Sequence, residues 1–137
     1  MTQPKGKNAP RSIPAPLDMP PEEFRRLGHQ TVDRIADLFE ELRKRPVTSG
    51  ESPEQIRALL EDARPLPENG QPAEALLHRA SQLLLDHSLY NGHPKFWGYI
   101  TASAAPIGIL GEMLAGAVNP NLGGWLLSPM ATEIEAQ

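Results

Sequence analysis

The sequence predicts a mainly α-helical chain built from short helices of unequal length. Apolar residues recur at three-to-four spacing in several segments, which is the spacing of one face of an α-helix. Residues that favour helix starts stand directly before several of these segments, and prolines separate them. Fifteen prolines and eleven glycines are high counts for a compact helical domain, so we expect stiff, irregular connectors between the helices.

The first predicted helix follows a polar, proline-rich stretch. Residues 1–17 contain four prolines, two lysines and an arginine, and we expect a disordered tail or an arm that drapes over another surface. The helix is predicted to begin near Asp18 as N-cap, with Pro20 and Pro21 in its first turn, and to end before Pro46. Its apolar face consists of Phe24, Leu27, Thr31 or Val32, Ile35, Leu38, Phe39 and Leu42.

Three further helices are predicted downstream. The segment "SPEQ" places Ser52 as N-cap and Gln55 at the third helical position, which is the spacing of a capping box, and this helix is expected to end before Pro65. The third helix is predicted over 72–87 and the fourth over 106–118. Each of these helices has one apolar face that needs a covering surface, so we expect them to lie over another body.

The last residues open one more helix. Ser128 and Pro129 are predicted as its N-cap and first position, and the sequence stops at Gln137, barely two turns later. A helix of this length is marginal in water on its own. We therefore expect the sequence to be the front part of a longer protein.

Few residues are candidates for catalysis or metal binding. The four histidines show no H-x-x-x-H spacing with a nearby carboxylate, so no metal site is predicted. Lys5 and Lys7 lie in a polar tail and Lys44 lies among arginines, while Lys95 alternates with aromatic residues and is expected to point outward. No catalytic residue is predicted. Among the histidines, only His93 stands beside the aromatic stretch described next.

Composition excludes several classes of partner. The formal charge of −4 gives no basic footprint for nucleic acid. The most apolar run is interrupted by Pro106 and Glu112 and is too weakly hydrophobic for a membrane span. The sequence has no cysteine and no visible secretory signal, so we expect a cytoplasmic protein.

The stretch "HPKFWGYITASAAP", residues 93–106, concentrates aromatic side chains. Phe96, Trp97 and Tyr99 lie within four positions, in a chain that has three Phe, two Trp and two Tyr. Alternation would allow an extended segment with Phe96 on one side and with Trp97, Tyr99 and Thr101 on the other. A Tyr beside a Thr hydroxyl can form the wall of a ligand site, although the same residues could pack between helices as ordinary core.

Residues 93–137 also carry an ordered set of landmarks. These are H-P-x-F at 93–96, an aromatic–apolar–Thr turn at 99–101, N-x-N before a Trp at 119–125, and S-P-x-x-T-E-x-E at 128–135. In this order and spacing, they resemble the N-terminal part of the group II pyridoxal-phosphate-dependent amino-acid decarboxylases. The upstream segment "MPPEEFRRLGHQTVDRIADLFEEL" resembles the first helix of that family, so the likeness runs from about Met19 to Gln137.

The resemblance implies a fold and an assembly. Family members have the fold-type I architecture, α/β when complete, with an N-terminal helical segment that packs over the partner subunit of a homodimer. It implies that residues 18–92 are this helical segment. It also implies that residues 93–137 contain a substrate-pocket loop, a helix and the start of a large cofactor-binding domain, before which the sequence is truncated.

The resemblance also implies site residues. The segment Tyr99, Ile100, Thr101 and Ala102 is similar to the loop that contacts the amino-acid substrate in that family. The segment Asn121, Leu122 and Gly123 resembles a loop that reaches into the pocket of the neighbouring subunit. Aromatic-specific members carry bulkier residues in this second loop, which disfavours an aromatic substrate.

The cofactor residues of the family are expected downstream of this sequence. The complete enzyme would bind pyridoxal phosphate, and this chain alone would bind none and would be inactive. The sequence leaves two alternatives open, a standalone helical protein-interaction module and a regulatory partial subunit. The DNA after codon 137 would separate the decarboxylase fragment from both alternatives, because only the fragment predicts a reading frame that continues to a His-Lys motif.

Overall fold

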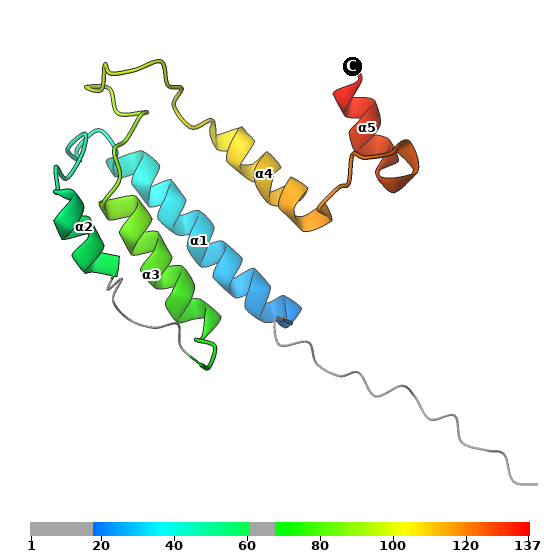
Figure 1. Cartoon of the computed structure of the whole chain (residues 1–137), viewed down its shortest axis with the longest axis horizontal. Helices are drawn as coiled ribbons and strands as arrows, with labels where there is room; N and C mark the ends of the chain where they lie inside the picture. The colour runs from blue at the N-terminus through cyan, green and yellow to red at the C-terminus, as the bar shows by residue number, and fades with distance from the viewer. Residues whose placement is uncertain (1–17, 61–67) are drawn as a thin grey trace, which may run out of the picture.

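The computed structural model describes residues 18–60 and 68–137, and its elements are helical (Figure 1). The predicted tail over 1–17 lies outside the described residues, as do residues 61–67. The described part contains no strand, which confirms the mainly α prediction. Its elements are α1 (Pro21–Glu41), α2 (Pro53–Leu60), α3 (Ala73–Asp86), α4 (Pro106–Val118), the 3₁₀ helix η1 (Trp125–Leu127) and α5 (Pro129–Glu135).

The predicted bounds of α3 and α4 agree with the structure within one residue, whereas both ends of α1 differ from the prediction. Helix α1 ends at Glu41, several residues before Pro46, and the predicted end of the second helix before Pro65 lies outside the described residues. The N-cap of α1 is Pro20 rather than Asp18, so that prediction is wrong. A residue that precedes proline is kept out of the α region, and both Met19 and Pro20 precede a proline. The helix can therefore begin only at Pro21, whose fixed φ angle suits the first helical position.

The start of α2 forms the predicted capping box. The backbone N–H of Ser52 donates to Oε1 of Gln55 at 2.7 Å, and the backbone N–H of Gln55 donates to Oγ of Ser52 at 3.3 Å. Ser128 and Pro129 also take their predicted places at the start of α5. Ser128 contributes its carbonyl there, which accepts hydrogen bonds from the backbone N–H and the hydroxyl of Thr132.

Helices α1 and α3 run side by side in the same direction, and α2 packs beside α3 in the opposite direction (Figure 1). Two polar contacts join α1 to α3, one between Arg26 and Glu74 and one between Arg34 and His78, each at 2.7 Å. Leu27, with an exposed fraction of 3%, is the only apolar residue that is buried among the described residues. The helical segment therefore has almost no hydrophobic core of its own.

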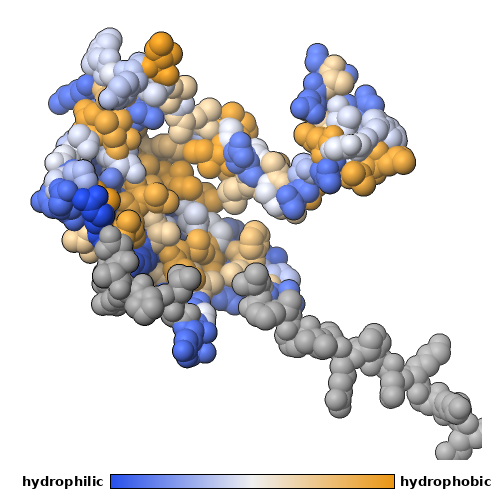
Figure 2. All heavy atoms as spheres, in the orientation of Figure 1, coloured by the Kyte–Doolittle hydropathy of each residue, from blue (hydrophilic) through white to orange (hydrophobic). Residues whose placement is uncertain are grey.

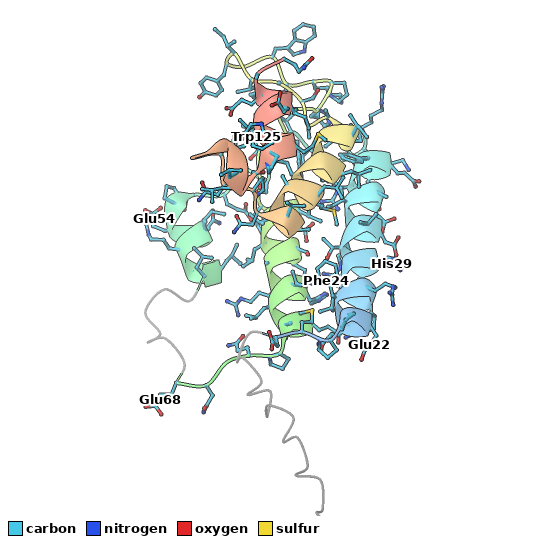
Figure 3. The ribbon with its side chains drawn as sticks, turned by 90° about the vertical axis from the view of Figure 1, so that its right-hand side faces the viewer. Glu22, Phe24, His29, Glu54, Glu68 and Trp125 are labelled. Atoms are coloured by element: carbon cyan, nitrogen blue, oxygen red, sulfur yellow. The ribbon has the colours of Figure 1, made fainter. Side chains whose placement is uncertain are left out.

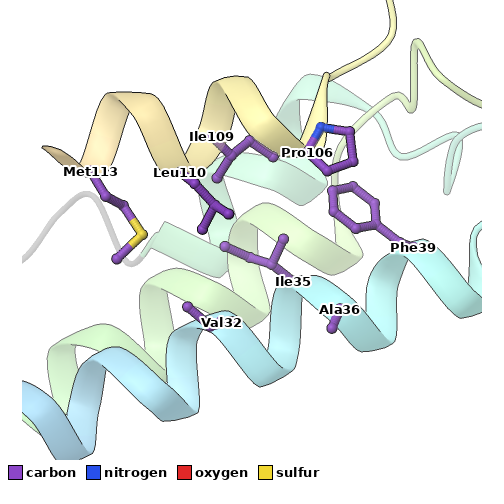
Figure 4. Close-up of a pocket in the computed structure, with 8 residues that line it drawn as sticks. All are labelled: Val32, Ile35, Ala36, Phe39, Pro106, Ile109, Leu110 and Met113. Carbon is purple, nitrogen blue, oxygen red and sulfur yellow. The ribbon is translucent and has the colours of Figure 1, made fainter. Parts of the chain in front are cut away.

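Helix α4 runs antiparallel to α1, and the two helices are separated by a groove (Figure 1). An apolar groove of about 160 Å³ lies between the two helices. It is lined by Val32, Ile35, Ala36, Phe39, Pro106, Ile109, Leu110 and Met113 (Figure 4). Apolar side chains gather on this face of the molecule (Figure 2). Ile107, Leu114 and Val118 of α4 are each more than 70% exposed, so the apolar surfaces expected to need a cover are uncovered in this chain.

We expect the isolated 137-residue chain to be helical and to self-associate. A monomer normally exposes single, scattered apolar side chains, whereas this chain exposes whole apolar helix faces. A single buried leucine also gives the unfolding transition little cooperativity. Sedimentation should show concentration-dependent oligomers, and thermal unfolding followed by circular dichroism should be broad. A sharp two-state transition of a monomer would contradict this expectation.

Candidate functional site

The aromatic stretch forms a loop instead of the extended segment that alternation allowed. Tyr99 has a φ angle of 57°, in the left-handed region that a bulky residue rarely adopts. This conformation reverses the alternation of side chains, and the rings of Phe96 and Tyr99 face each other with centroids 6.4 Å apart. The expectation that these two side chains lie on opposite sides is therefore wrong.

The structure separates the four predicted substrate residues into two groups. The exposed fractions of Tyr99 and Ile100 are 88% and 106%, and Thr101 is also exposed. Ala102 lines a hollow of about 610 Å³ between the end of α1 and residues 89–92. Tyr99, Ile100 and Thr101 are thus accessible to another surface or to a ligand.

The two ends of the loop meet at Gly92 and Ser103. A Cβ atom placed on Gly92 would lie 3.1 Å from Cβ of Ser103, which is tighter than ordinary van der Waals contact. Glycine allows this close approach because it has no side chain. Residues 93–102 consequently form a closed loop, similar in its narrow base to an Ω-loop, with Tyr99 in its outer part. We call residues 93–102 the wall loop.

His93 anchors the first residue of the wall loop. It is the one buried polar side chain among the described residues, with an exposed fraction of 3%. Its Nδ1 accepts a hydrogen bond from the backbone N–H of Lys95 at 3.0 Å. Its Nε2 must therefore carry the proton, which it donates to the backbone carbonyl of Arg45, also at 3.0 Å. His93 has a structural role in this chain and does not line a site.

The second predicted segment lies beyond the other end of α4. Asn119 ends α4 in the left-handed conformation, with a φ angle of 46°. Asn121 then accepts a hydrogen bond from the backbone N–H of Gly123 at 2.9 Å, which forms a tight turn in which Leu122 is exposed. Because α4 has 13 residues, it separates the wall loop from this turn by about 20 Å.

The turn leads into a small folded unit at the end of the chain. Trp125 lies in η1, and its indole N–H donates to the carboxylate of Glu133 on α5 at 2.7 Å (Figure 3). Residues 121–123 are all exposed, as are the outer residues of the wall loop. The structure therefore does not bring the two predicted site segments together within one chain.

The described residues do not fit the covalent chemistry of pyridoxal phosphate. A lysine that forms a Schiff base must be desolvated or crowded by other cations, and Lys44 and Lys95 are both exposed. Within 18–60 and 68–137, no group of His, Asp and Glu side chains is arranged to hold a metal ion. No helix in these ranges is long and apolar enough to cross a membrane.

Two carboxylates with lowered pKa values take part in contacts between different parts of the fold. Hydrogen bonds from the hydroxyl of Ser49 and from His87 lower the pKa of Glu51. The guanidinium of Arg26 lowers the pKa of Glu74 in the same way. The contact of Glu51 with His87 joins the segment before α2 to the end of α3, and the contact of Arg26 with Glu74 joins α1 to α3. These shifts reflect polar contacts within the fold and do not mark a catalytic group.

Comparison with known proteins supports the resemblance to the decarboxylases. The chain is 38% identical to a phenylacetaldehyde synthase of Petunia hybrida over 116 residues, and this aligned region is 85% of the chain. It is 35% identical over 121 residues to tyrosine/DOPA decarboxylase 2 of Papaver somniferum, and 35% identical over 115 residues to tyrosine decarboxylase 4 of Petroselinum crispum. Over these residues the chain is homologous to the N-terminal part of group II pyridoxal-phosphate-dependent amino-acid decarboxylases.

A solved structure supports the fold of this decarboxylase segment. The glutamate decarboxylase domain of a diaminobutyrate-pyruvate transaminase and L-2,4-diaminobutyrate decarboxylase from Vibrio parahaemolyticus superposes with a TM-score of 0.70. The superposition covers 82% of this chain and 24% of that chain, at 18% sequence identity. No protein-family model matches the sequence.

The match covers a small part of each related protein. The chain spans 22% of the petunia, parsley and poppy enzymes named above, and its fold is that of the N-terminal helical region of the decarboxylase. The prediction of a helical N-terminal segment of this family is thus confirmed.

Proposed function

We propose that this chain is the N-terminal part of a pyridoxal-phosphate-dependent amino-acid carboxy-lyase. In this proposal it contributes subunit contacts and one wall of the substrate pocket, and it is inactive alone. The main support is the homology with tyrosine and DOPA decarboxylases over 84–88% of the chain. The cofactor would be bound by the rest of the complete enzyme, and none by this chain alone.

The uncovered helix faces support a role in a homodimer. The groove between α1 and α4 has an entirely apolar lining, and Leu110 and Leu114 of α4 are 50% and 71% exposed. Covering such side chains stabilises an assembly by about 25 cal/mol for each Å² of apolar surface removed from water. A second subunit of the complete enzyme would supply this cover.

The positions of the two site segments support a pocket that is shared between subunits. The wall loop and the turn at 121–123 lie at opposite ends of α4, about 20 Å apart, and both are exposed. One pocket can receive both segments only if they come from two copies of the chain. Tyr99, Ile100, Thr101 and Ala102 would then contact the substrate of their own subunit, and Asn121, Leu122 and Gly123 that of the partner.

The chemical step would depend on groups outside this chain. In such enzymes pyridoxal phosphate supplies the electron sink for the loss of CO₂. The described residues could orient the amino acid and exclude water from it, because an aromatic ring and a hydroxyl stand together in the wall loop. Orientation of this kind can supply several kcal/mol of a reaction barrier.

The test of this proposal is CO₂ release by the complete protein that contains this chain. The complete protein, supplied with pyridoxal phosphate, should release CO₂ from at least one amino acid in a panel of tyrosine, DOPA, phenylalanine, glutamate and 2,4-diaminobutyrate. A chimera provides a second test, in which residues 18–137 replace the matching segment of the parsley tyrosine decarboxylase. An inactive complete protein and an inactive, correctly folded chimera would together refute the proposal.

A further inference from the structure

Arg45 lies at the point where three parts of the chain meet. It follows the end of α1, and its side chain is half-buried. Its Nη1 donates to the backbone carbonyl of Leu85 at 2.8 Å and to Oδ1 of Asp86 at 3.0 Å, both at the end of α3. Its Nη2 donates to the carboxylate of Glu41 at 3.1 Å, in the last turn of α1.

These contacts provide hydrogen-bond partners at the C-terminal ends of the two parallel helices. The last four carbonyls of a helix have no partner within the helix, and its C-terminal end carries a partial negative charge. The carbonyl of Leu85 is one of these groups, and a cation that bridges the ends of α1 and α3 stabilises both. A lysine could supply the charge, whereas only an arginine presents several donors in a fixed plane.

The same residue holds the start of the wall loop. Nη1 of Arg45 also donates to the hydroxyl of Tyr90 at 3.0 Å, and this hydroxyl donates in turn to the carbonyl of Leu85. The backbone N–H of Tyr90 donates to the carbonyl of Val47 at 3.0 Å. The backbone carbonyl of Arg45 accepts the hydrogen bond from the buried ring of His93.

We propose that Arg45 is a positioning residue for the substrate pocket. Its guanidinium joins the ends of α1 and α3, and its carbonyl fixes His93, from which the wall loop extends to Tyr99. The contact of Gly92 with Ser103 closes the base of the same loop, so a shift at His93 moves the whole loop. The effect on catalysis rests on the proposed function. The anchoring of the wall loop by Arg45 does not depend on that proposal.

The first measurement is amide hydrogen exchange at the start of the wall loop. Arg45→Met keeps the aliphatic part of the side chain and removes every donor, and Arg26→Met makes the same change in the other α1–α3 ion pair, near the opposite end of these helices. The amides of Lys95 and Phe96 donate to His93 and therefore report on the anchor. In the complete protein, their hydrogen exchange should become about 10-fold faster in Arg45→Met and stay unchanged in Arg26→Met. Equal exchange in both variants would overturn the proposal.

The second measurement is kinetic. In the complete enzyme, Arg45→Met should lower kcat/KM by at least about 10-fold, because small displacements of an orienting group have large effects on rate. Arg45→Lys should recover part of this loss. A purely structural residue would lower the melting temperature and leave kcat/KM of the folded enzyme unchanged, and that result would refute the positioning role.

Together, the two measurements distinguish a failure of the decarboxylase proposal from a failure of the positioning role of Arg45. A complete protein that releases no CO₂, but in which Arg45→Met speeds exchange at Lys95, would refute the decarboxylase proposal and leave the anchored loop intact. An active enzyme whose Arg45→Met variant retains full kcat/KM would refute the positioning role alone. If Arg45→Met does not fold, His93→Gln tests the same anchor, because its amide can donate to the Arg45 carbonyl but cannot accept from Lys95 as the ring does.

Discussion

Tyr99→Ala in the complete enzyme is expected to lower kcat/KM by about 100-fold, or about 2.7 kcal/mol of transition-state stabilisation. The ring of Tyr99 is 88% exposed in this chain, and its one ring partner is Phe96. It therefore contributes little to the packing of the segment, although its backbone is held in an unfavourable left-handed conformation. The expected loss arises from a contact with the substrate that forms only in the complete enzyme.

Phe96→Ala is the matched control for this variant. Phe96 is half-buried, and its ring lies about 3.0 Å from the position that a Cβ on Gly98 would occupy. Its removal should lower the free energy of unfolding by about 2 kcal/mol, less than for a fully buried phenylalanine, and should change kcat/KM much less than Tyr99→Ala does. If Tyr99→Ala instead lowers the melting temperature and retains kcat/KM, Tyr99 is a packing residue and the substrate assignment is wrong.

The 137-residue chain alone is expected to show no decarboxylase activity in the presence of pyridoxal phosphate. Lys44 and Lys95 are exposed to water, whereas a lysine that attacks the cofactor needs a desolvated or cation-crowded site. Spectra of the mixture should match those of free pyridoxal phosphate, and borohydride reduction followed by peptide mass analysis should find no lysine modified stoichiometrically.

The complete protein is the positive control for this experiment. It should trap one cofactor per chain at a lysine outside residues 1–137. A stoichiometric adduct at a single lysine of the isolated chain, or measurable CO₂ release from an amino acid, would show that the segment binds and uses the cofactor without the remainder of the enzyme.

The helices could be predicted from the sequence because their signals are local. The capping box at Ser52 and the boundaries of α4 follow from residues within one turn of each helix end. The start of α1 was predicted wrongly because the capping preference of Asp18 was weighed without the constraint that successive prolines impose on the residues before them. The likeness to the decarboxylases was also recognisable, because its landmarks are sequence motifs.

The geometry of the wall loop could not be predicted, because it depends on contacts between distant positions. The left-handed backbone of Tyr99 has no local signal, since glycine, asparagine and aspartate are the residues expected there. Nothing in the sequence around Arg45 indicates its contacts with Leu85 or His93, forty or more positions away.

The near absence of a hydrophobic core in the described residues has a consequence for biosynthesis. If the chain is the front of a decarboxylase, it leaves the ribosome before any surface that could cover α1, α3 and α4 exists. At about 5–20 residues per second, the remainder of a protein of which this segment is about a fifth takes tens of seconds to emerge. During that interval the apolar faces of the first helices are substrates for chaperones. In that case the segment that is synthesised first would be among the last to reach its final packing, once the proposed homodimer assembles.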